Sequence, residues 1–247
     1  MTPPTDKPHA EFDVYAANYE AGMENPLRRC VGGDAESFIK LKVDWLLRRL
    51  QGTSSLSHAS ANMRLLDYGC GAGTMLSLLG RHGFSGTLAG CDVSQEMLAE
   101  ARRRWSSGSC PDLRLIEHER APFDAGQFDV VVLSSVLHHV PVPGRNAVYA
   151  DATRVLAPGG RICIFEHNPY NPLTCWVVRH TPIDKNAVLL KPCEVRTGLR
   201  DLGLSRLQTR YIMFFPPRWE LFRPLDAALC WLPCGAQYVV SARKGAR

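Results

Sequence analysis

The chain has 247 residues, of which 45% are hydrophobic and 21% are charged, and its formal net charge is +5 at pH 7. These values exclude a disordered chain, and the length suits one α/β domain with additions. No apolar run approaches the ~18 residues of a membrane span, and the start, MTPPTDKPHAEFD, lacks the basic and apolar regions of a signal peptide. We therefore expect a cytoplasmic protein without a membrane span.

The positive charge is concentrated in one region. Between residues 167 and 224, nine lysines and arginines stand against four acids, and the rest of the chain is neutral. No block of consecutive basic residues occurs in this region, so we do not expect a nucleic-acid partner. The nine cysteines form no CxxC pair and show no zinc-ligand spacing. We therefore expect buried free thiols and no metal site.

The first predicted elements are helical. FDVYAANYE (12–20) carries aromatic residues at helical spacing, which indicates a short helix. Asp34 is a suitable N-cap for an amphipathic helix that ends near residue 50. Its apolar face contains Phe38, Ile39, Val43, Leu46, Leu47 and Leu50. A polar, serine-rich linker, residues 51–62, leads from this helix into the first strand.

The central region alternates strand and helix. Strands are predicted at 64–68, at 87–92, at 113–119, at 128–135 and at 161–166. Helices are predicted from Gly73 to His82, after the N-cap Ser94, and from Gly144 through Leu156. Five such units require a parallel, doubly wound sheet with right-handed crossovers.

The last third follows a different pattern. Residues 167–193 contain four prolines and no clear periodicity, which is more typical of a functional insertion than of a simple connection. A short helix (194–202) follows, then a strand (204–214), a proline-interrupted apolar turn and helix (214–235), and a final strand (236–242). The two strands could pair as an antiparallel edge.

The most informative stretch is LLDYGCGAGTM (65–75), a strand, a tight glycine turn and a helix start. A phosphate-binding loop requires GxxxxGK[ST], and a dinucleotide loop requires GxGxxG. This loop is GxGxG, with Thr74 in the place of the third dinucleotide glycine, and it has no lysine. A glycine-rich connection without any ligand is the alternative, so the neighbouring strand ends must decide.

Polar residues follow four of the predicted strands, and in a doubly wound sheet such strand ends meet in one crevice. They are the glycine loop, Asp92, Glu117 with His118, and the segment 134–139. Asp92, at a strand end, can accept hydrogen bonds from both hydroxyls of a ribose. The alternative is an acid that caps a surface turn, and the ribose interpretation fits NAD as well as other nucleosides.

Together, LLDYGCGAGTM, GCDVSQEML, FDVVVLSSVLHHV and RVLAPGGRICIFE resemble the motifs of class I S-adenosylmethionine-dependent methyltransferases of the small-molecule, type 11-like branch. The resemblance implies a Rossmann-like, doubly wound and mostly parallel seven-stranded sheet. It also implies an antiparallel C-terminal edge strand and a lid insertion. S-adenosyl-L-methionine has no phosphate, which agrees with a GxGxG loop that lacks lysine.

The resemblance implies a cofactor site of thirteen residues: Tyr15, Tyr19, Asp67, Gly69, Cys70, Gly71, Gly73, Asp92, Val93, Met97, Glu117, His118 and Ser134. Glu117 stands where the family usually has Asp against the adenine. The two tyrosines are implied to fold over the cofactor, and core packing is the alternative role for them.

Methyl transfer is an in-line displacement, and it needs a base only if the acceptor must lose a proton. The candidate catalytic residues are His139, His138, Glu166 and His167. His139 matches the recurring family position, although its role could be to shape the loop. We expect one of the two adjacent histidines to be structural.

We expect residues 1–62 to form a helical segment and linker that cover the cofactor site, and residues 63–247 to form the methyltransferase domain. The acceptor-binding insertion is predicted at about 167–193. It offers amides and cations for a small-molecule acceptor with apolar bulk, a natural product or lipid-like metabolite: Asn168, Asn171, Arg179, His180, Lys185 and Lys191. The alternatives are a solvated basic face, a protein that binds the cofactor without transfer, and an NAD-dependent oxidoreductase.

Overall fold

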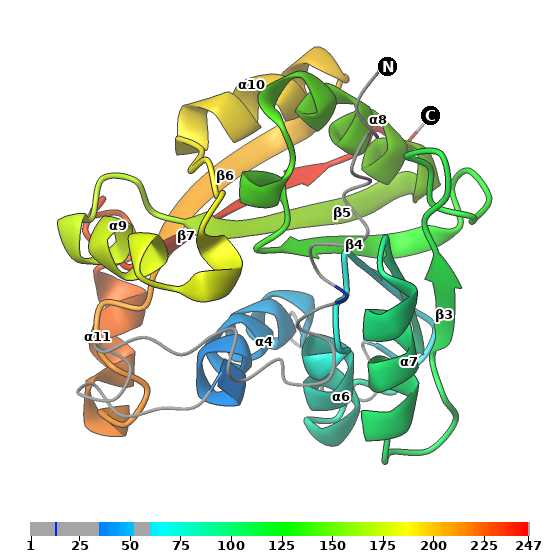
Figure 1. Cartoon of the computed structure of the whole chain (residues 1–247), viewed down its shortest axis with the longest axis horizontal. Coiled ribbons are helices and arrows are strands. Elements are labelled where there is room, and N and C mark those ends of the chain that lie inside the picture. Colours follow the sequence, from blue (N-terminus) through cyan, green and yellow to red (C-terminus); the bar gives the residue numbers. More distant parts are fainter. Residues whose placement is uncertain (1–12, 14–34, 52–59, 247) are drawn as a thin grey trace, which may run out of the picture.

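The centre of the fold is a seven-stranded sheet with the order β3-β2-β1-β4-β5-β7-β6 (Figure 1). The computed structural model describes residue 13, residues 35–51 and residues 60–246. The strands are β1 (Arg64–Tyr68), β2 (Thr87–Asp92), β3 (Asp112–Leu115), β4 (Phe128–Ser134), β5 (Leu156–His167), β6 (Ser205–Ile212) and β7 (Gln237–Arg243). β1 to β5 are parallel, as predicted, and β7 runs antiparallel to β5 and to β6.

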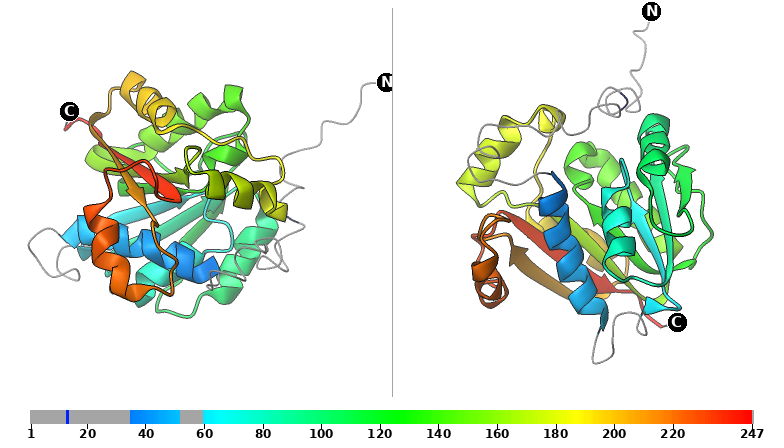
Figure 2. Two further views of the ribbon diagram at one scale, coloured as in Figure 1. Left: turned by 90° about the vertical axis from the view of Figure 1, so that its left-hand side faces the viewer. Right: turned by 90° about the horizontal axis from the view of Figure 1, so that it is seen from below.

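Helices cover both faces of the sheet (Figures 1 and 2). One face carries α4 (Ala35–Gln51), α6 (Thr74–Arg81) and α7 (Gln95–Arg104), and the other carries α8 (Arg145–Val155) and α10 (Pro192–Asp201). Successive strand residues point to opposite faces of the sheet. Leu65 therefore packs in the core beneath α4, α6 and α7, and Leu66 packs in the core beneath α8 and α10. The strands are therefore buried on both sides, which explains their continuous apolar runs.

Two further helices, α9 (Pro172–Arg179) and α11 (Arg223–Ala228), lie beyond one end of the sheet (Figure 2). α9 lies inside the insertion predicted to lack periodicity. It begins because Asn171 accepts a hydrogen bond from the amide of Thr174 at 3.0 Å, and because Pro172 at the first helical position has no amide hydrogen to satisfy. Short 3-10 helices form at Leu137–His139 (η1), Val142–Gly144 (η2), Pro182–Asp184 (η3) and Glu220–Phe222 (η4).

Two predicted element boundaries were wrong. The third strand was expected to reach residue 119 but ends at Leu115. Beyond it the backbone has positive φ at His118 and Glu119, a conformation that cannot continue a strand. The fifth strand begins at Leu156, before the predicted turn, since β5 continues across Gly159, whose φ is +75°, with an irregular register against β4.

The predicted antiparallel pairing of the last two strands is confirmed. β7 lies between β5 and β6, so β6 is the outermost strand and its carboxyl end lies at the same edge as that of β5. All eight cysteines in the described part of the chain are free thiols, as expected, but only three of these eight, Cys70, Cys91 and Cys163, are buried. The helices of that part are all too short or too polar to cross a membrane.

The strand order reverses between β1 and β4, because the chain adds β2 and β3 on one side of β1 and β4 and β5 on the other. In open α/β sheets, the crevice for a ligand lies at such a switch point, outside the carboxyl ends of the strands. The residues that end β1, β2, β4 and β5 therefore define the candidate site.

Candidate functional site at the switch point

The glycine loop after β1 turns sharply toward the neighbouring strand end. Gly69 and Cys70 donate backbone hydrogen bonds to the carbonyl of Cys91 at 2.7 and 2.9 Å. The φ angles of Gly69, Gly71 and Gly73 are +77°, +50° and +73°, in the region that L side chains rarely adopt. The predicted turn is confirmed.

The three glycines serve different purposes. A Cβ at Gly69 would lie 2.6 Å from the side chain of Val136, and one at Gly73 would lie 2.8 Å from Ala101, so these two glycines allow close packing. A Cβ at Gly71 would meet nothing within 4 Å. The open space that a ligand could approach therefore adjoins Gly71.

Asp92, the last residue of β2, is tied to this loop. One carboxylate oxygen accepts a hydrogen bond from the amide of Gly71 at 2.7 Å, and the other accepts one from the amide of Ser94 at 3.0 Å. Each carboxylate oxygen has two acceptor positions, so both can still accept a hydroxyl hydrogen. Burial raises the pKa of Asp92, although these amide hydrogen bonds act in the opposite direction.

Asp67 contributes a second carboxylate at the end of β1. It is 2% exposed, and within the described ranges no hydrogen-bond partner reaches its Oδ1. Burial, with a smaller contribution from Asp92, raises the pKa of Asp67 to about 7, while Lys42 acts in the opposite direction. A buried carboxylate oxygen without a partner is costly, and a bound cation or donor would relieve this cost.

Lys42, on α4, is a site residue that the sequence reasoning did not include. It is 3% exposed, and its ammonium donates hydrogen bonds to the hydroxyls of Ser134 and Ser135 at 3.0 and 2.8 Å. Burial lowers the pKa of Lys42 to about 8, although nearby carboxylates, chiefly Glu166, favour its charge. Lys42 lies on the apolar stripe of α4, and a charged residue on such a stripe is the indication that could have identified it.

Burying Lys42 costs about 3 kcal/mol on the scale of its pKa shift. The same helix buries Val43, Leu46 and Leu47, each of which contributes ~1.5–3 kcal/mol of hydrophobic stabilisation. The apolar contacts are therefore sufficient to hold the lysine in the site.

The pair of His138 and Glu166 is fully buried behind the strand ends. Nδ1 of His138 lies 2.5 Å from Oε2 of Glu166, and Oε1 of Glu166 accepts hydrogen bonds from the amides of Val136 and Leu137 at 3.1 and 2.8 Å. Burial alone would lower the pKa of His138, but the carboxylates of Glu166 and Asp184 outweigh it and raise this pKa to about 9. Glu166 and His138 therefore hold the loop after β4 in place.

His139 and His167 lie beside this pair and are more open, each with 18% of its side chain exposed. Nε2 of His139 lies 3.5 Å from Oδ1 of Asp184, and Nε2 of His167 lies 3.9 Å from Oδ2 of the same carboxylate. Burial and the charge of His138 lower the pKa of His139 to about 3 and that of His167 to about 4. Both rings are therefore neutral at pH 7.

All four candidate catalytic residues thus lie in one cluster, together with Asp184, which the sequence reasoning did not select. Asp184 lies on η3 within the insertion and is 7% exposed. Burial would raise the pKa of Asp184, but the neighbouring histidines, led by His138, lower it. No local pattern marks Asp184, because its histidine contacts are tertiary.

The remaining cofactor candidates differ in how they lie. Glu117 and His118 are both exposed on the loop after β3, where Glu117 forms an isolated bridge with Arg120. Met97 is buried, and Cys70 packs its sulfur toward Gly90. Val93 is half-buried, and the hydroxyl of Ser134 already accepts a hydrogen bond from Lys42. The predicted helix at 12–20, with Tyr15 and Tyr19, lies outside the described residues apart from Asp13.

The insertion offers fewer polar groups to an acceptor than its sequence suggests. Asn168 donates hydrogen bonds to the carbonyls of Pro233 and Gly235 at 3.0 and 2.7 Å, and Asn171 donates one to the carbonyl of Cys234 at 2.7 Å. These amides join the insertion to the segment before β7. The basic side chains of the insertion are all exposed, as a solvated face would have them: Arg179, His180, Lys185 and Lys191.

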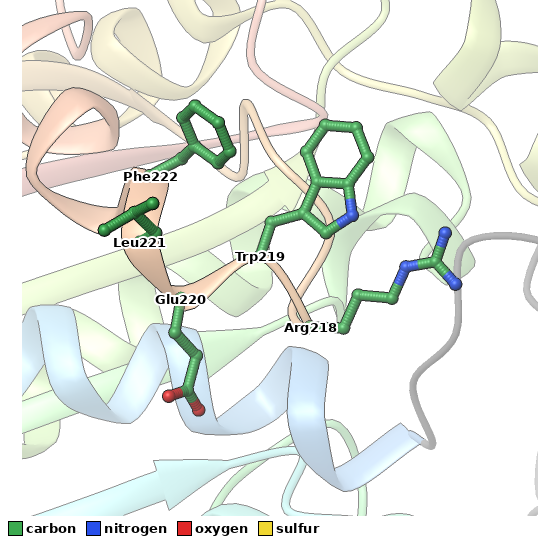
Figure 3. Close-up of a pocket in the computed structure, with 5 residues that line it drawn as sticks. All are labelled: Arg218, Trp219, Glu220, Leu221 and Phe222. Atoms are coloured by element: carbon green, nitrogen blue, oxygen red, sulfur yellow. The ribbon is translucent and has the colours of Figure 1, made fainter.

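A surface pocket of about 420 Å³ lies at the turn formed by residues 218–222 (Figure 3). The rings of Trp219 and Phe222 lie 5.8 Å apart at this turn, and Glu220 points away from them. Five consecutive residues line this pocket, so it is the hollow of one turn and not the crevice at the switch point.

Comparisons with known proteins agree with this geometry. A family model described as a methyltransferase domain matches residues 65–160. A ubiquinone biosynthesis O-methyltransferase of Pseudomonas paraeruginosa is 34% identical over 176 residues, which cover 67% of this chain and 71% of the relative. A malonyl-acyl-carrier protein O-methyltransferase of Herminiimonas arsenicoxydans is 40% identical over 98 residues, 40% of this chain and 35% of that protein.

The chain spans 29% and 35% of the length of two of the curated relatives it matches. Among solved structures, the magnesium protoporphyrin IX methyltransferase from Synechocystis with bound SAH superposes with a TM-score of 0.61. It is 16% identical, and the match covers 97% of this chain and 100% of that one. The chain belongs to the class I S-adenosylmethionine-dependent methyltransferases, whose cofactor is S-adenosylmethionine.

Proposed function

We propose that the protein transfers the methyl group of S-adenosylmethionine to an oxygen atom of a small-molecule acceptor with apolar bulk. One observation carries the proposal. The hydrogen bond from the amide of Gly71 to Asp92 lies at the switch point of the sheet. The buried cluster around His138 lies at the same switch point, on the ends of the neighbouring strands. A nucleoside-binding half and a half able to accept a proton thus face one crevice.

The hydrogen-bond acceptors that remain available in the nucleoside-binding half of the site fit the cofactor. Both oxygens of Asp92 can accept the ribose hydroxyls, and the partnerless oxygen of Asp67 can accept the ammonium of the methionine part. Gly71 leaves space for the ligand beside the backbone. When bound, S-adenosylmethionine supplies a methyl carbon on a sulfonium sulfur, which leaves with its electron pair as the acceptor oxygen attacks that carbon.

The N-terminal segment is proposed to cover this half. Asp13 supports this role, because its carboxylate accepts a hydrogen bond from the hydroxyl of Ser94 at 2.5 Å, two residues beyond Asp92. Asp13 therefore lies at the ribose end of the site. Tyr15 and Tyr19 remain candidates to close over the cofactor.

His139 is proposed as the base that receives the hydroxyl proton of the acceptor. It is neutral at pH 7 and partly open, and Asp184, whose Oδ1 lies 3.5 Å from its Nε2, offsets part of the burial and of the His138 charge that lower its pKa to about 3. His138 and Glu166 are proposed to position the loop, since both are fully buried. The remaining work of the site is to align the oxygen with the methyl carbon and to exclude water.

Apolar side chains beside the site support an acceptor with apolar bulk. The carboxyl end of β6 lies at the same edge as the histidine cluster, and the segment that follows it exposes large apolar groups, as α9 does. They are Leu173, Trp176, Trp219, Leu221, Phe222, Leu225 and Trp231. The name of the Pseudomonas relative, an O-methyltransferase, supports oxygen as the acceptor atom.

The test is incorporation of labelled methyl from S-adenosylmethionine into a panel of hydroxylated acceptors. The panel should pair each polar acceptor with a counterpart that carries an apolar chain, together with amine and thiol analogues of the same size. We expect label in the apolar hydroxyl compounds. Tight cofactor binding without transfer to any acceptor would instead indicate a protein that binds the cofactor and does not catalyse.

A further inference from the structure

Three side chains from separate elements of the chain converge within the histidine cluster. His138 lies on η1 after β4, His167 is the last residue of β5, and Asp184 lies on η3 in the insertion. One nitrogen from each histidine and one oxygen of the carboxylate all lie within 4.8 Å of one another. We propose that these three residues bind a divalent transition-metal ion of the zinc class.

The distance between His138 and Asp184 is that of two ligands of one ion rather than of hydrogen-bonded partners. Nε2 of His138 lies 3.5 Å from one oxygen of Asp184, and Nε2 of His167 lies 3.9 Å from the other. A charge-assisted hydrogen bond would be about 2.7–2.9 Å long. Two ligand atoms held about 2.0–2.2 Å from one tetrahedral ion are about 3.3–3.5 Å apart. Small movements of His167 would complete this geometry.

An atom that lacks a partner points into the group. His138 is 1% exposed, and across the described ranges no hydrogen-bond partner reaches its Nε2. Its other nitrogen is engaged by Glu166, which is itself fixed by two backbone amides. A carboxylate that orients the far side of a histidine ring is the usual support of a metal-binding histidine.

The charges favour a cation of this kind. Glu166 lies 2.5 Å from one ring nitrogen of His138 and Asp184 lies 3.5 Å from the other, so two carboxylates surround that ring. A divalent cation bound at Nε2 would offset the charge of these two carboxylates. Two imidazoles and one carboxylate suit zinc-class ions, whereas calcium and magnesium prefer oxygen ligands alone.

The proposed site supplies only three protein ligands to the metal ion. Three protein ligands leave one position open, which is the arrangement of catalytic rather than structural zinc sites. The histidines on the open side, His139 and His167, are partly exposed, so an acceptor oxygen could occupy that position beside His139. This role in methyl transfer rests on the proposed function, whereas the binding of the metal does not.

Metal-free wild-type protein should be titrated with Co²⁺, without cofactor or acceptor, while the visible absorption is recorded. We expect one equivalent to bind and to give the ligand-field bands of a nitrogen and oxygen site. Sulfur-to-cobalt charge-transfer absorption, which the exposed thiols of Cys110, Cys193 or Cys234 would cause, should be absent. Displacement by Zn²⁺ then gives the zinc affinity.

Variants decide whether this binding belongs to the proposed site. His167→Gln and Asp184→Asn should abolish the bands, and Glu166→Gln should weaken binding by about 10–100-fold through the orientation of His138. His82→Gln is the matched control, because His82 is a half-buried histidine at the end of α6 and should bind as wild type does. Circular dichroism should verify each fold, and if Asp184→Asn fails to fold, His167→Gln alone is decisive.

No stoichiometric cobalt binding, or equal binding by wild type and His167→Gln, would overturn the inference. Methyl transfer should be measured separately, with and without a chelator. A protein that transfers methyl but binds no cobalt would disprove the metal site and leave the proposed function intact. Cobalt binding that depends on His167, in a protein that transfers no methyl group, would support the metal site and contradict the proposed function.

Discussion

The imidazole of His138 and the carboxylate of Glu166 form a buried pair, with Nδ1 2.5 Å from Oε2, at the ends of adjacent strands. Because Glu166 also receives two amide hydrogen bonds, the pair joins β5 to the loop after β4. The more open His139 follows directly in that loop. The position of the loop that carries His139 therefore depends on a pair of side chains that does not reach solvent.

Glu166→Gln should lower the free energy of unfolding by about 3 kcal/mol, because it leaves the charge on His138 buried without its main partner. Urea denaturation at pH 7 measures this. Glu36→Gln is the control, since Glu36 pairs with Arg81 at the surface, where an ion pair contributes less than about 1 kcal/mol. Equal effects of the two substitutions would show that the buried pair does not stabilise the fold.

Lys42 makes stability depend on pH. Between its folded pKa of about 8 and its ordinary value of 10.5, the unfolded chain retains a proton that the folded chain has released. Stability from this group is therefore lowest below pH 8 and rises with pH across that window. The stability difference between wild type and Lys42→Met should shift in favour of wild type by about 3 kcal/mol from pH 7 to 10.5. A difference that stays constant would refute the buried, charged lysine.

Gly69→Ala and Gly71→Ala form a matched pair, because both place a side chain at positive φ, with a strain of about 1–2 kcal/mol. Gly69→Ala should lose clearly more stability, since its Cβ also meets Val136 at 2.6 Å. Gly71→Ala should instead lose cofactor affinity, because its Cβ projects into open space. Thermal unfolding and calorimetry separate the two, and the opposite order would contradict the assignment of the open side.

Asp92→Ala should weaken S-adenosylmethionine binding by at least a hundredfold, since it removes both ribose acceptors and the anchor of the Gly71 amide. Calorimetry measures the affinity. Asp112→Asn serves as the control, because Asp112 is an exposed acid at the start of β3 that pairs with Arg114. An unchanged affinity in Asp92→Ala would remove the ribose assignment.

His139→Gln should lower kcat about a hundredfold, as expected for loss of a general base, and should leave the KM for S-adenosylmethionine unchanged. The comparison needs an acceptor identified in the labelled panel, and His82→Gln is again the control. If kcat does not change, His139 only shapes the loop.

Much of the fold could be predicted because its determinants are local. Apolar runs and turn residues predict every strand of the sheet, and the bounds of β1 match residue for residue. The same patterns could not predict where β3 ends, since its limit is set by backbone geometry at His118 and Glu119. Nor could they predict α9, whose short apolar stripe is hidden among prolines.

The candidate site could be predicted where a motif carries it and not where tertiary contacts create it. The motifs correctly place the glycine loop, Asp92 and the histidines on neighbouring strand ends, and the family is confirmed. Lys42 and Asp184 reach the site from a helix and a loop distant in sequence. Their roles follow from packing, which no local pattern records.

The most direct test of the central claim, a nucleoside site built for a cofactor without phosphates, is calorimetry of the wild-type protein with S-adenosylmethionine and with NAD. The loop has no lysine and no third dinucleotide glycine, while Asp92 and Asp67 offer acceptors for hydroxyls and an ammonium. We predict stoichiometric binding of S-adenosylmethionine and no measurable binding of NAD. Tighter binding of NAD would contradict the account.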